Sequence, residues 1–112
     1  MLHRRDFAPE ARPPLTGLRV VDLSRLVAGN MVSLQLADHG AEVIKVEDPA
    51  KGDPLLAWRV QGHSRHWKVY ARNKRSLARD LHDPEGRSLL ADLLAGADVL
   101  IENFSPGALQ AM

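Results

Sequence analysis

Residues 18–47 constrain the fold of this chain more than any other stretch. They contain an apolar run at 19–23, a segment with a wide apolar helical face, and a second apolar run at 41–46 that leads to a carboxylate. Strand, helix and strand in this order form a βαβ unit, which is the building block of parallel sheets. Such sheets bind ligands beyond the carboxyl ends of their strands. Residues 24–30 and 47–52 are therefore the first places to look for function.

The segment between these two strands carries helix start and stop signals. Asn30 is a favourable N-cap residue, and Gly40 suits the left-handed position that follows a helix. The apolar face is too wide for a surface helix, so the sequence predicts a well-buried helix. After the second strand, residues 48–54 are typical of a loop. Residues 55–69 predict only one or two helical turns, and residues 62–66 again indicate a loop.

A second strand–helix–strand pattern follows. Alternating residues at 76–81 predict a half-exposed strand. The sequence Asp-Pro-Glu beginning at Asp83 is typical of a helix start, and Gly96 marks the end of that helix. The apolar run within 98–104 predicts a buried strand, and Ser105 followed by proline predicts a last helix. We therefore expect an α/β fold of Rossmann-like βαβ units with a mainly parallel sheet.

Composition limits the remaining possibilities. The chain has 112 residues, no cysteine and a net charge of +1, and no apolar run is long enough to cross a bilayer. Disulfide and thiol chemistry are thereby excluded, and neither a nucleic acid nor a membrane is an expected partner. Residues 1–14 contain three prolines and no apolar signal segment, so we expect a flexible arm before a domain at 15–112. The expected compartment is the cytoplasm.

The turn at residues 24–30 allows two interpretations. Ala28 and Gly29 leave room for a ligand near the backbone, and the N–H groups of a helix N-terminus attract anions. The spacing Gly-x-Gly-x-x-Gly is absent, so there is no standard dinucleotide fingerprint. The same small residues also suit a tight strand-to-helix turn. Asp22, just before this turn, either caps it or faces the site.

Charged and histidine residues give weaker signals. Glu47 ends a strand where a carboxylate can hold a ribose hydroxyl, but a solvent-facing acid is the favoured interpretation. A basic cluster either holds phosphates or forms a solvated face, and the second is favoured because nearby acids offset it. That cluster consists of Arg72, Lys74, Arg75 and Arg79. His63 and His66 have helical metal-ligand spacing but lack a third ligand, so no metal site is expected.

Residues 102–107 place a polar strand end, an aromatic ring and a helix start together. Phe104 would offer a surface on which an adenine stacks, and the helix start would meet a phosphate. The alternative is a simple strand-end cap with Phe104 in the core. The sequence leaves both interpretations open.

Four stretches together resemble the N-terminal part of the family III CoA transferases, which include formyl-CoA and carnitinyl-CoA transferases and α-methylacyl-CoA racemase. They are Leu15-Thr-Gly-Leu-Arg-Val-Val-Asp-Leu-Ser-Arg with Ala28-Gly29, Leu36-Ala-Asp-His-Gly-Ala-Glu-Val-Ile-Lys-Val-Glu47 with Gly52-Asp53-Pro54, Arg72-Asn-Lys-Arg-Ser-Leu77 with Asp80-Leu81 and Asp83-Pro-Glu-Gly86, and Ala97-Asp-Val-Leu-Ile-Glu-Asn-Phe104 with Pro106-Gly107. Their order and spacing are those of the family. The resemblance covers residues 15–112.

The resemblance implies a Rossmann-like large domain, acyl-CoA and carboxylate substrates, an interlocked homodimer and no tightly bound cofactor. The family's nucleophilic aspartate attacks the acyl-CoA carbonyl, and an aspartyl-CoA thioester follows. The position of that aspartate lies beyond residue 112. We therefore expect a truncated chain that contains no catalytic residue and is inactive alone. The alternatives are a fragment of an acyl-CoA racemase, in which an Asp and a His move the α-proton, and a non-catalytic CoA- or nucleotide-binding module.

By position in the family's motifs, the resemblance also implies which residues contact coenzyme A (CoA). These are Val27, Ala28, Arg79, His82, Asn103, Phe104 and Ser105. The chain departs from the family at Asn30, where proline is usual, and at Asp48, which is basic in some members. The segment between 54 and 70 is shorter than usual, and Ala111 stands where a basic residue is common.

Overall fold

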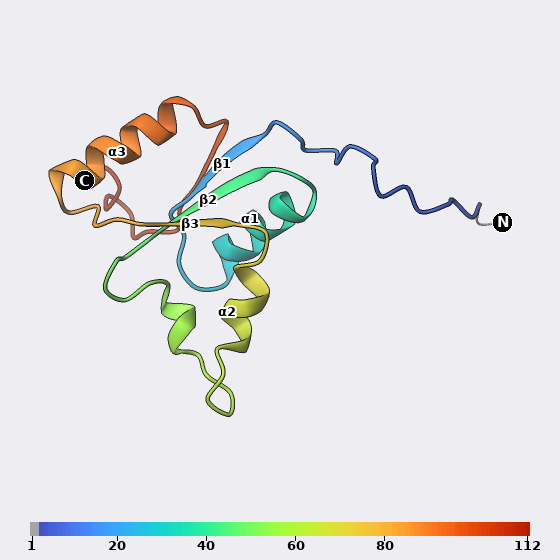
Figure 1. Cartoon of the computed structure of the whole chain (residues 1–112). Coiled ribbons are helices and arrows are strands. Elements are labelled where there is room, and N and C mark those ends of the chain that lie inside the picture. The colour runs from blue at the N-terminus through green and yellow to red at the C-terminus, as the bar shows by residue number, and fades with distance from the viewer. Residues whose placement is uncertain (1–2) are drawn as a thin grey trace.

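A computed structural model describes residues 3–112. Its four strands form one parallel sheet in the order β3-β2-β1-β4 (Figure 1). In chain order the elements are β1 (Arg19–Asp22), α1 (Ala28–Asp38), β2 (Glu42–Glu47), the 3-10 helix η1 (Pro54–Ala57), α2 (Arg65–Tyr70), β3 (Arg75–Ala78), α3 (Pro84–Ala95) and β4 (Val99–Ile101). The expected α/β class and parallel sheet are confirmed.

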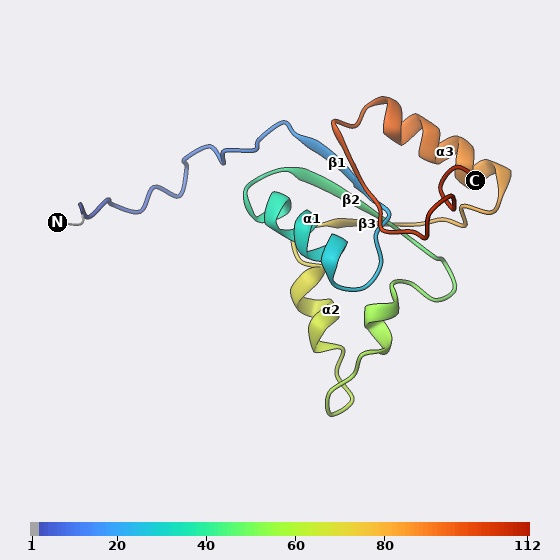
Figure 2. The ribbon, with the colours of Figure 1, turned by 180° about the vertical axis from the view of Figure 1, so that it is seen from behind.

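Helices lie on both faces of the sheet. Helices α1 and α2 lie on one side and α3 on the other, as opposite views show (Figure 1; Figure 2). Successive side chains of a strand point to opposite faces, so Val20 packs with Ala37 of α1 while Val21 packs with Leu90 of α3. The sheet is therefore the middle layer between two aliphatic cores.

The start of α1 differs from the prediction. Val27, not Asn30, is the N-cap residue, because the Met31 N–H already donates to Val27 O at 2.8 Å. Asn30 lies inside the helix and is fully buried. The prediction of a well-buried helix holds only in part, because Leu34 and Ala37 are buried together with the small and polar residues Gly29, Asn30 and Ser33. Met31 and Val32 are 50% and 52% exposed.

Two further elements correct the prediction. Residues 106–111 form turns and not a helix, because Gly107 has a φ of 83°, which a right-handed helix cannot continue. Helix α2 begins at Arg65, inside the segment expected to be a loop. Residues 3–12 of the N-terminal arm extend away from the body of the protein (Figure 1), whereas Pro13 lies against Gly40. Over residues 3–112, no helix has the length and apolar character that crossing a membrane would require.

Candidate functional site

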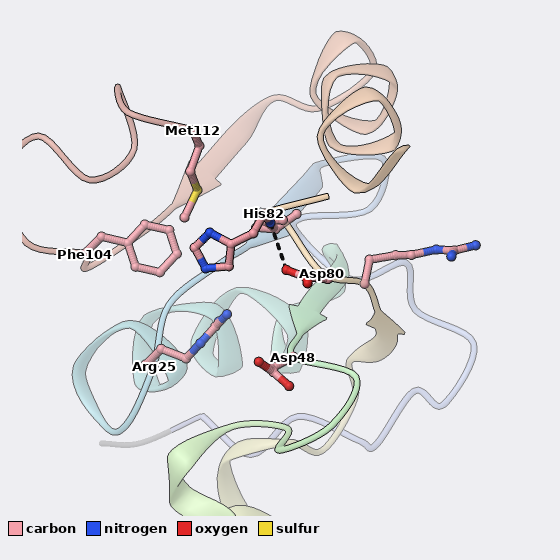
Figure 3. Close-up of a pocket in the computed structure, with 8 residues that line it drawn as sticks. Arg25, Asp48, Asp80, His82, Phe104 and Met112 are labelled. Atoms are coloured by element: carbon pink, nitrogen blue, oxygen red, sulfur yellow. Dashed lines mark hydrogen bonds between the residues drawn. The ribbon is translucent and has the colours of Figure 1, made fainter. Parts of the chain in front are cut away.

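A cavity lies beyond the carboxyl ends of the strands, where the sequence indicated that a ligand would bind. Its volume is about 150 Å³. Figure 3 shows the side chains around it. It is lined by Arg25, Asp48, Arg79, Asp80, Leu81, His82, Phe104 and Met112. These residues come from the segments that follow all four strands, so the parallel topology itself creates the cavity.

Arg25 is one of the two arginines that line this cavity, and no motif of the sequence singled it out. Its guanidinium carbon lies 5.6 Å from the centre of the Phe104 ring, a cation–π distance. Its Nη1 donates to Leu23 O at 2.6 Å and to Val46 O at 3.2 Å. These contacts fix the side chain between the ends of β1 and β2. The one signal available in the sequence was that Arg25 lies within residues 24–30, the turn already considered as a ligand site.

The charges around the cavity balance. Arg25 and Arg79 bring two positive charges, and Asp48 and Asp80 bring two negative charges. The N–H groups of Lys51 and Ala50 donate to the Asp48 carboxylate and hold its pKa below its usual value. Asp48 is therefore ionised at neutral pH, and the cavity is polar without being strongly basic.

Three of the seven predicted CoA contacts meet in this cavity. They are Arg79, His82 and Phe104. The His82 N–H donates to Asp80 Oδ1 at 2.8 Å, which fixes the turn after β3 (Figure 3). The segments that follow β3 and β4 thus line the same cavity, although more than 20 residues of sequence separate His82 from Phe104.

The other four predicted contacts do not line the cavity. Val27 is the N-cap residue of α1, Ala28 is its exposed first residue, and Ser105 is exposed in the segment after β4. Asn103 instead bonds twice to the backbone of Arg25, accepting from its N–H and donating to its carbonyl, both at 2.8 Å. Asn103 therefore fixes the backbone of Arg25, whose guanidinium group contacts Phe104.

A second hollow of about 410 Å³ adjoins the first. The two share Arg25 and Asp48, and the second is completed by residues of the loop after β2 and of η1. Together they form one surface along the carboxyl edge of the sheet, with charged residues at Arg25 and Asp48 and apolar residues of η1 at Pro54 and Ala57.

The predicted basic cluster does not exist as one surface. Three of its members form separate ion pairs: Arg72 with Asp38 at 2.6 Å, Arg75 with Glu42 at 3.0 Å, and Lys74 with Asp22 at 3.5 Å. The Arg72 contact lowers the pKa of Asp38. The Lys74 side chain is only 2% exposed, so the interpretation as a solvated face is wrong for this residue. Only Arg79 reaches the cavity.

A buried polar network lies beneath the turn between β1 and α1. Its members are Asp22, Ser24, Asn30, Ser33, Lys45, Asp53 and Lys74. Lys45 Nζ lies 3.1 Å from Asp53 Oδ2 and 3.8 Å from Asp22 Oδ2. With Lys74, two ammonium groups face two carboxylates, as buried charges require. One signal was present in the sequence, since Asp22 and Lys45 are charged residues within two otherwise apolar strands. In the sheet these two residues are register partners.

Asp53 is ionised within this network. Burial opposes its ionisation, but hydrogen bonds from the Leu55 N–H and from Asn30, together with the charge of Lys45, outweigh burial and lower its pKa. Asp53 therefore presents a full negative charge to Lys45.

Glu47 is buried, and the favoured prediction of a solvent-facing acid is wrong. It is 7% exposed, because β3 pairs alongside it and the loop at Gly52 covers it. Ser76 Oγ donates to Glu47 Oε2, while Oε1 finds no hydrogen-bond partner among residues 3–112.

His66 packs edge-on against Trp58, with 5.8 Å between the ring centres. The described part of the chain has no group of three or more residues arranged to hold a metal.

Lys74 should make stability depend on pH. Burial lowers its pKa to about 8, and the attraction of Asp22 only partly offsets this effect. A lysine in the unfolded chain has a pKa of about 10.4, so between pH 8 and pH 10 the unfolded chain binds more protons than the folded chain. Urea denaturation should therefore give a free energy of unfolding that rises through this window, by about 1 kcal/mol per pH unit at the steepest point.

The matched comparison is Lys74→Met against Lys68→Met, since Lys68 is exposed on α2. Lys74→Met should lose the rise, whereas Lys68→Met should keep it. If the free energy of unfolding of the unaltered chain did not change between pH 8 and pH 10, the lowered pKa of Lys74 would be contradicted.

The sheet order, the helices on both faces and the cavity at the carboxyl edge define a Rossmann-like α/β domain. The model of CoA-transferase family III matches residues 15–112, and the chain belongs to that family. It is 47% identical over 100 residues to succinyl-CoA–D-citramalate CoA-transferase of Chloroflexus aurantiacus, covering 87% of this chain and 25% of that protein. It is 42% identical to human succinyl-CoA:glutarate CoA-transferase, covering 88% of this chain and 23% of that protein.

Solved structures agree with this assignment. A CAIB/BAIF family protein from Brucella suis has a TM-score of 0.83 and 42% identity, with 90% of this chain and 28% of that chain covered. A hypothetical protein from Mycobacterium tuberculosis has a TM-score of 0.81 and 34% identity, with 88% and 28% covered. The chain thus spans about a quarter of the length of the curated relatives it matches.

Proposed function

We propose that this chain supplies part of the CoA site of an enzyme that transfers CoA between an acyl-CoA thioester and a carboxylic acid. The observation that supports this proposal is the meeting of Arg79, His82 and Phe104 in one cavity beyond the carboxyl ends of the strands. These residues follow two different strands. Phe104 belongs to a stretch that resembles the family, and Arg79 and His82 lie between the parts of another. The membership of the chain in CoA-transferase family III supports the reaction class.

The chemistry of the cavity suits one part of CoA. A flat aromatic face such as that of Phe104 stacks with an adenine, and guanidinium groups bind phosphate oxygens through paired hydrogen bonds. Arg25 is held over Phe104, and Arg79 lines the same cavity. A volume of about 150 Å³ is too small for a whole cofactor, but the adjoining hollow of about 410 Å³ extends it. The nucleotide end of CoA would lie along this combined surface.

The reaction itself would take place on residues that this sequence does not contain. An aspartate carboxylate would attack the thioester carbonyl and expel the CoA thiolate, which leaves a mixed anhydride. The thiolate would then attack the aspartyl carbonyl, release the first carboxylate and form an aspartyl-CoA thioester that passes CoA to the acceptor. In this proposal the complete enzyme is a cytoplasmic homodimer, and succinyl-CoA is the first donor to test because the relatives use it.

Arg79→Ala and Phe104→Ala should each weaken CoA binding by about tenfold, the equivalent of about 1.4 kcal/mol. Each removes one kind of contact, a charged donor or a stacking surface, from the same cavity. Isothermal titration calorimetry of the chain with CoA measures the effect. Arg65→Ala on α2 and Phe7→Ala in the N-terminal arm are matched controls, because both residues are exposed and neither lines the cavity.

The outcomes separate the three candidate functions. Binding without turnover of succinyl-CoA and carboxylates is the expected result. An absence of binding at millimolar CoA would contradict a role in the CoA site. Turnover by the chain alone would contradict the placement of the nucleophile elsewhere, and exchange of the α-proton of an acyl-CoA would favour the racemase.

A further inference from the structure

The backbone of the turn between β1 and α1 is held by side chains at every polar group from Ser24 O to Leu26 O. Lys45 Nζ donates to Ser24 O at 2.7 Å. The Asn103 side chain accepts from the Arg25 N–H and donates to the Arg25 carbonyl. A turn of this kind normally bonds to water or to its own backbone. Here the bonds come from β2 and from the segment after β4, so distant parts of the fold determine the shape of the turn.

Leu26 is the strained residue of this turn. Its φ is 61°, in the left-handed region that bulky residues rarely adopt. The Leu26 N–H donates to Asp53 Oδ1 at 3.3 Å, and Leu26 O accepts from Asn30 Nδ2. Asn30 Nδ2 also donates to Asp53 Oδ2 at 2.8 Å, which joins the two holding side chains. Backbone strain persists only where the surroundings over-determine the conformation, and these bonds do so.

Asn30 lines neither hollow, while Asp53 belongs to the lining of the second. Asn30 is 0% exposed and Asp53 is 1% exposed. Both side chains also contact ammonium groups: Lys74 Nζ donates to Asn30 Oδ1 at 3.2 Å, and Lys45 Nζ pairs with Asp53 at 3.1 Å. Asn30 is not needed to cap α1, since Val27 is its N-cap residue without a side-chain bond. Asp53 caps η1 through the Leu55 N–H at 2.8 Å, and the same oxygen accepts from the Leu26 N–H. Their polar groups are directed at the turn.

The turn carries the residues that matter for the proposed site. Arg25 precedes Leu26 and lines both hollows, while Val27 and Ala28 follow it. We propose that Asn30 and Asp53 are positioning residues, which hold Leu26 in the left-handed conformation so that Arg25 and the start of α1 are arranged for CoA before it arrives. This inference rests on the proposed function. Pre-organisation of this kind increases affinity because less freedom is lost on binding.

The test compares Asn30→Ala, Leu26→Gly and the double variant in calorimetry with CoA. Asn30→Ala should weaken binding at least tenfold, although the residue touches no ligand. Leu26→Gly should bind within about threefold of the unaltered chain, because glycine adopts the left-handed conformation without steric cost. The double variant should recover to the level of Leu26→Gly. A purely structural role of Asn30 in packing α1 would not be rescued by a glycine at residue 26.

Amide hydrogen exchange at Leu26 provides a readout without CoA. Exchange should be at least tenfold faster in Asn30→Ala and unchanged in Asn73→Gly. The latter also removes an asparagine side chain, but Asn73 is itself left-handed and bonds to Asp38 at a distance from the turn. Asn30→Leu serves the same comparison if Asn30→Ala does not fold, since it nearly keeps the side-chain volume and removes the Nδ2 donor to Leu26 O.

Each outcome decides a separate point. If the unaltered chain binds CoA and Asn30→Ala binds equally well, or if glycine gives no rescue, the positioning role is overturned while the proposed function stands. If the unaltered chain does not bind CoA, the proposed function and the positioning role fall together. The exchange rates then still decide whether Asn30 holds the turn.

Discussion

Lys45→Met should lower the free energy of unfolding by about 3 to 5 kcal/mol. The Lys45 side chain is 1% exposed, and its ammonium group lies close to both Asp53 and Asp22. Methionine has a similar length but no charge, so two buried carboxylates would share only Lys74. A domain of this size has a total stability of about 5 to 15 kcal/mol, so this single change would remove a large part of it. Urea denaturation at pH 7 measures the loss.

The control for this change is Lys51→Met, in the exposed loop after β2. It should alter stability by no more than about 0.5 kcal/mol, as is usual for surface positions. Adding Asp53→Asn to Lys45→Met should restore part of the loss, because it removes one of the uncompensated charges. A loss below about 1 kcal/mol in Lys45→Met would show that the buried ion pairs do not support the fold.

Gly86→Ala should be the second most damaging change, with a loss of about 2 to 3 kcal/mol. A Cβ at Gly86 would lie 1.9 Å from Asp80 O and 2.9 Å from the carbonyl carbon of Asp80. Both atoms are backbone, so no rotation of a side chain relieves the clash. The first turn of α3 would have to move away from residues 80–82, which line the cavity.

Thermal or urea denaturation and CoA calorimetry together test this expectation. Both stability and CoA affinity should fall in Gly86→Ala, since the same contact supports the helix and one wall of the cavity. Ser88→Ala is the matched control, because Ser88 is an exposed residue of the same helix. Equal stability of Gly86→Ala and the unaltered chain would mean that α3 does not pack this closely on the turn.

Local pattern was sufficient to predict most of the fold. The apolar runs around Val21 and Val46, with a helical segment between them, required a parallel arrangement. Asp83 followed by proline placed the start of α3 correctly, and Gly96 follows its end. These signals are local because periodicity and capping depend on neighbours in the sequence. The prediction of a last helix after Ser105 was wrong, and the reason is also local. Gly107 adopts a left-handed conformation that the cap signal at Ser105 does not reveal.

The interior of the site was not predictable in the same way. Lys74 resembles a surface lysine until β3 pairs with β2 and brings it to Asp22. Asn30 has the type of side chain that caps helices, and only the position of Asp53 turns it inward. Arg25 gains its role from Asn103 and Phe104, which are remote in sequence. Such roles depend on tertiary neighbours, which a single sequence does not display.

The balanced charges beneath the turn have a consequence for how the protein responds to ionic strength. Two lysines and two aspartates cancel one another at positions that solvent ions do not reach. Their attraction is therefore almost unscreened, and the shape of the turn stays the same from dilute buffer to concentrated salt. Arg79, by contrast, is exposed, and its contacts with an anion are screened. Added salt would thus weaken the hold on a phosphate while leaving intact the framework that presents it.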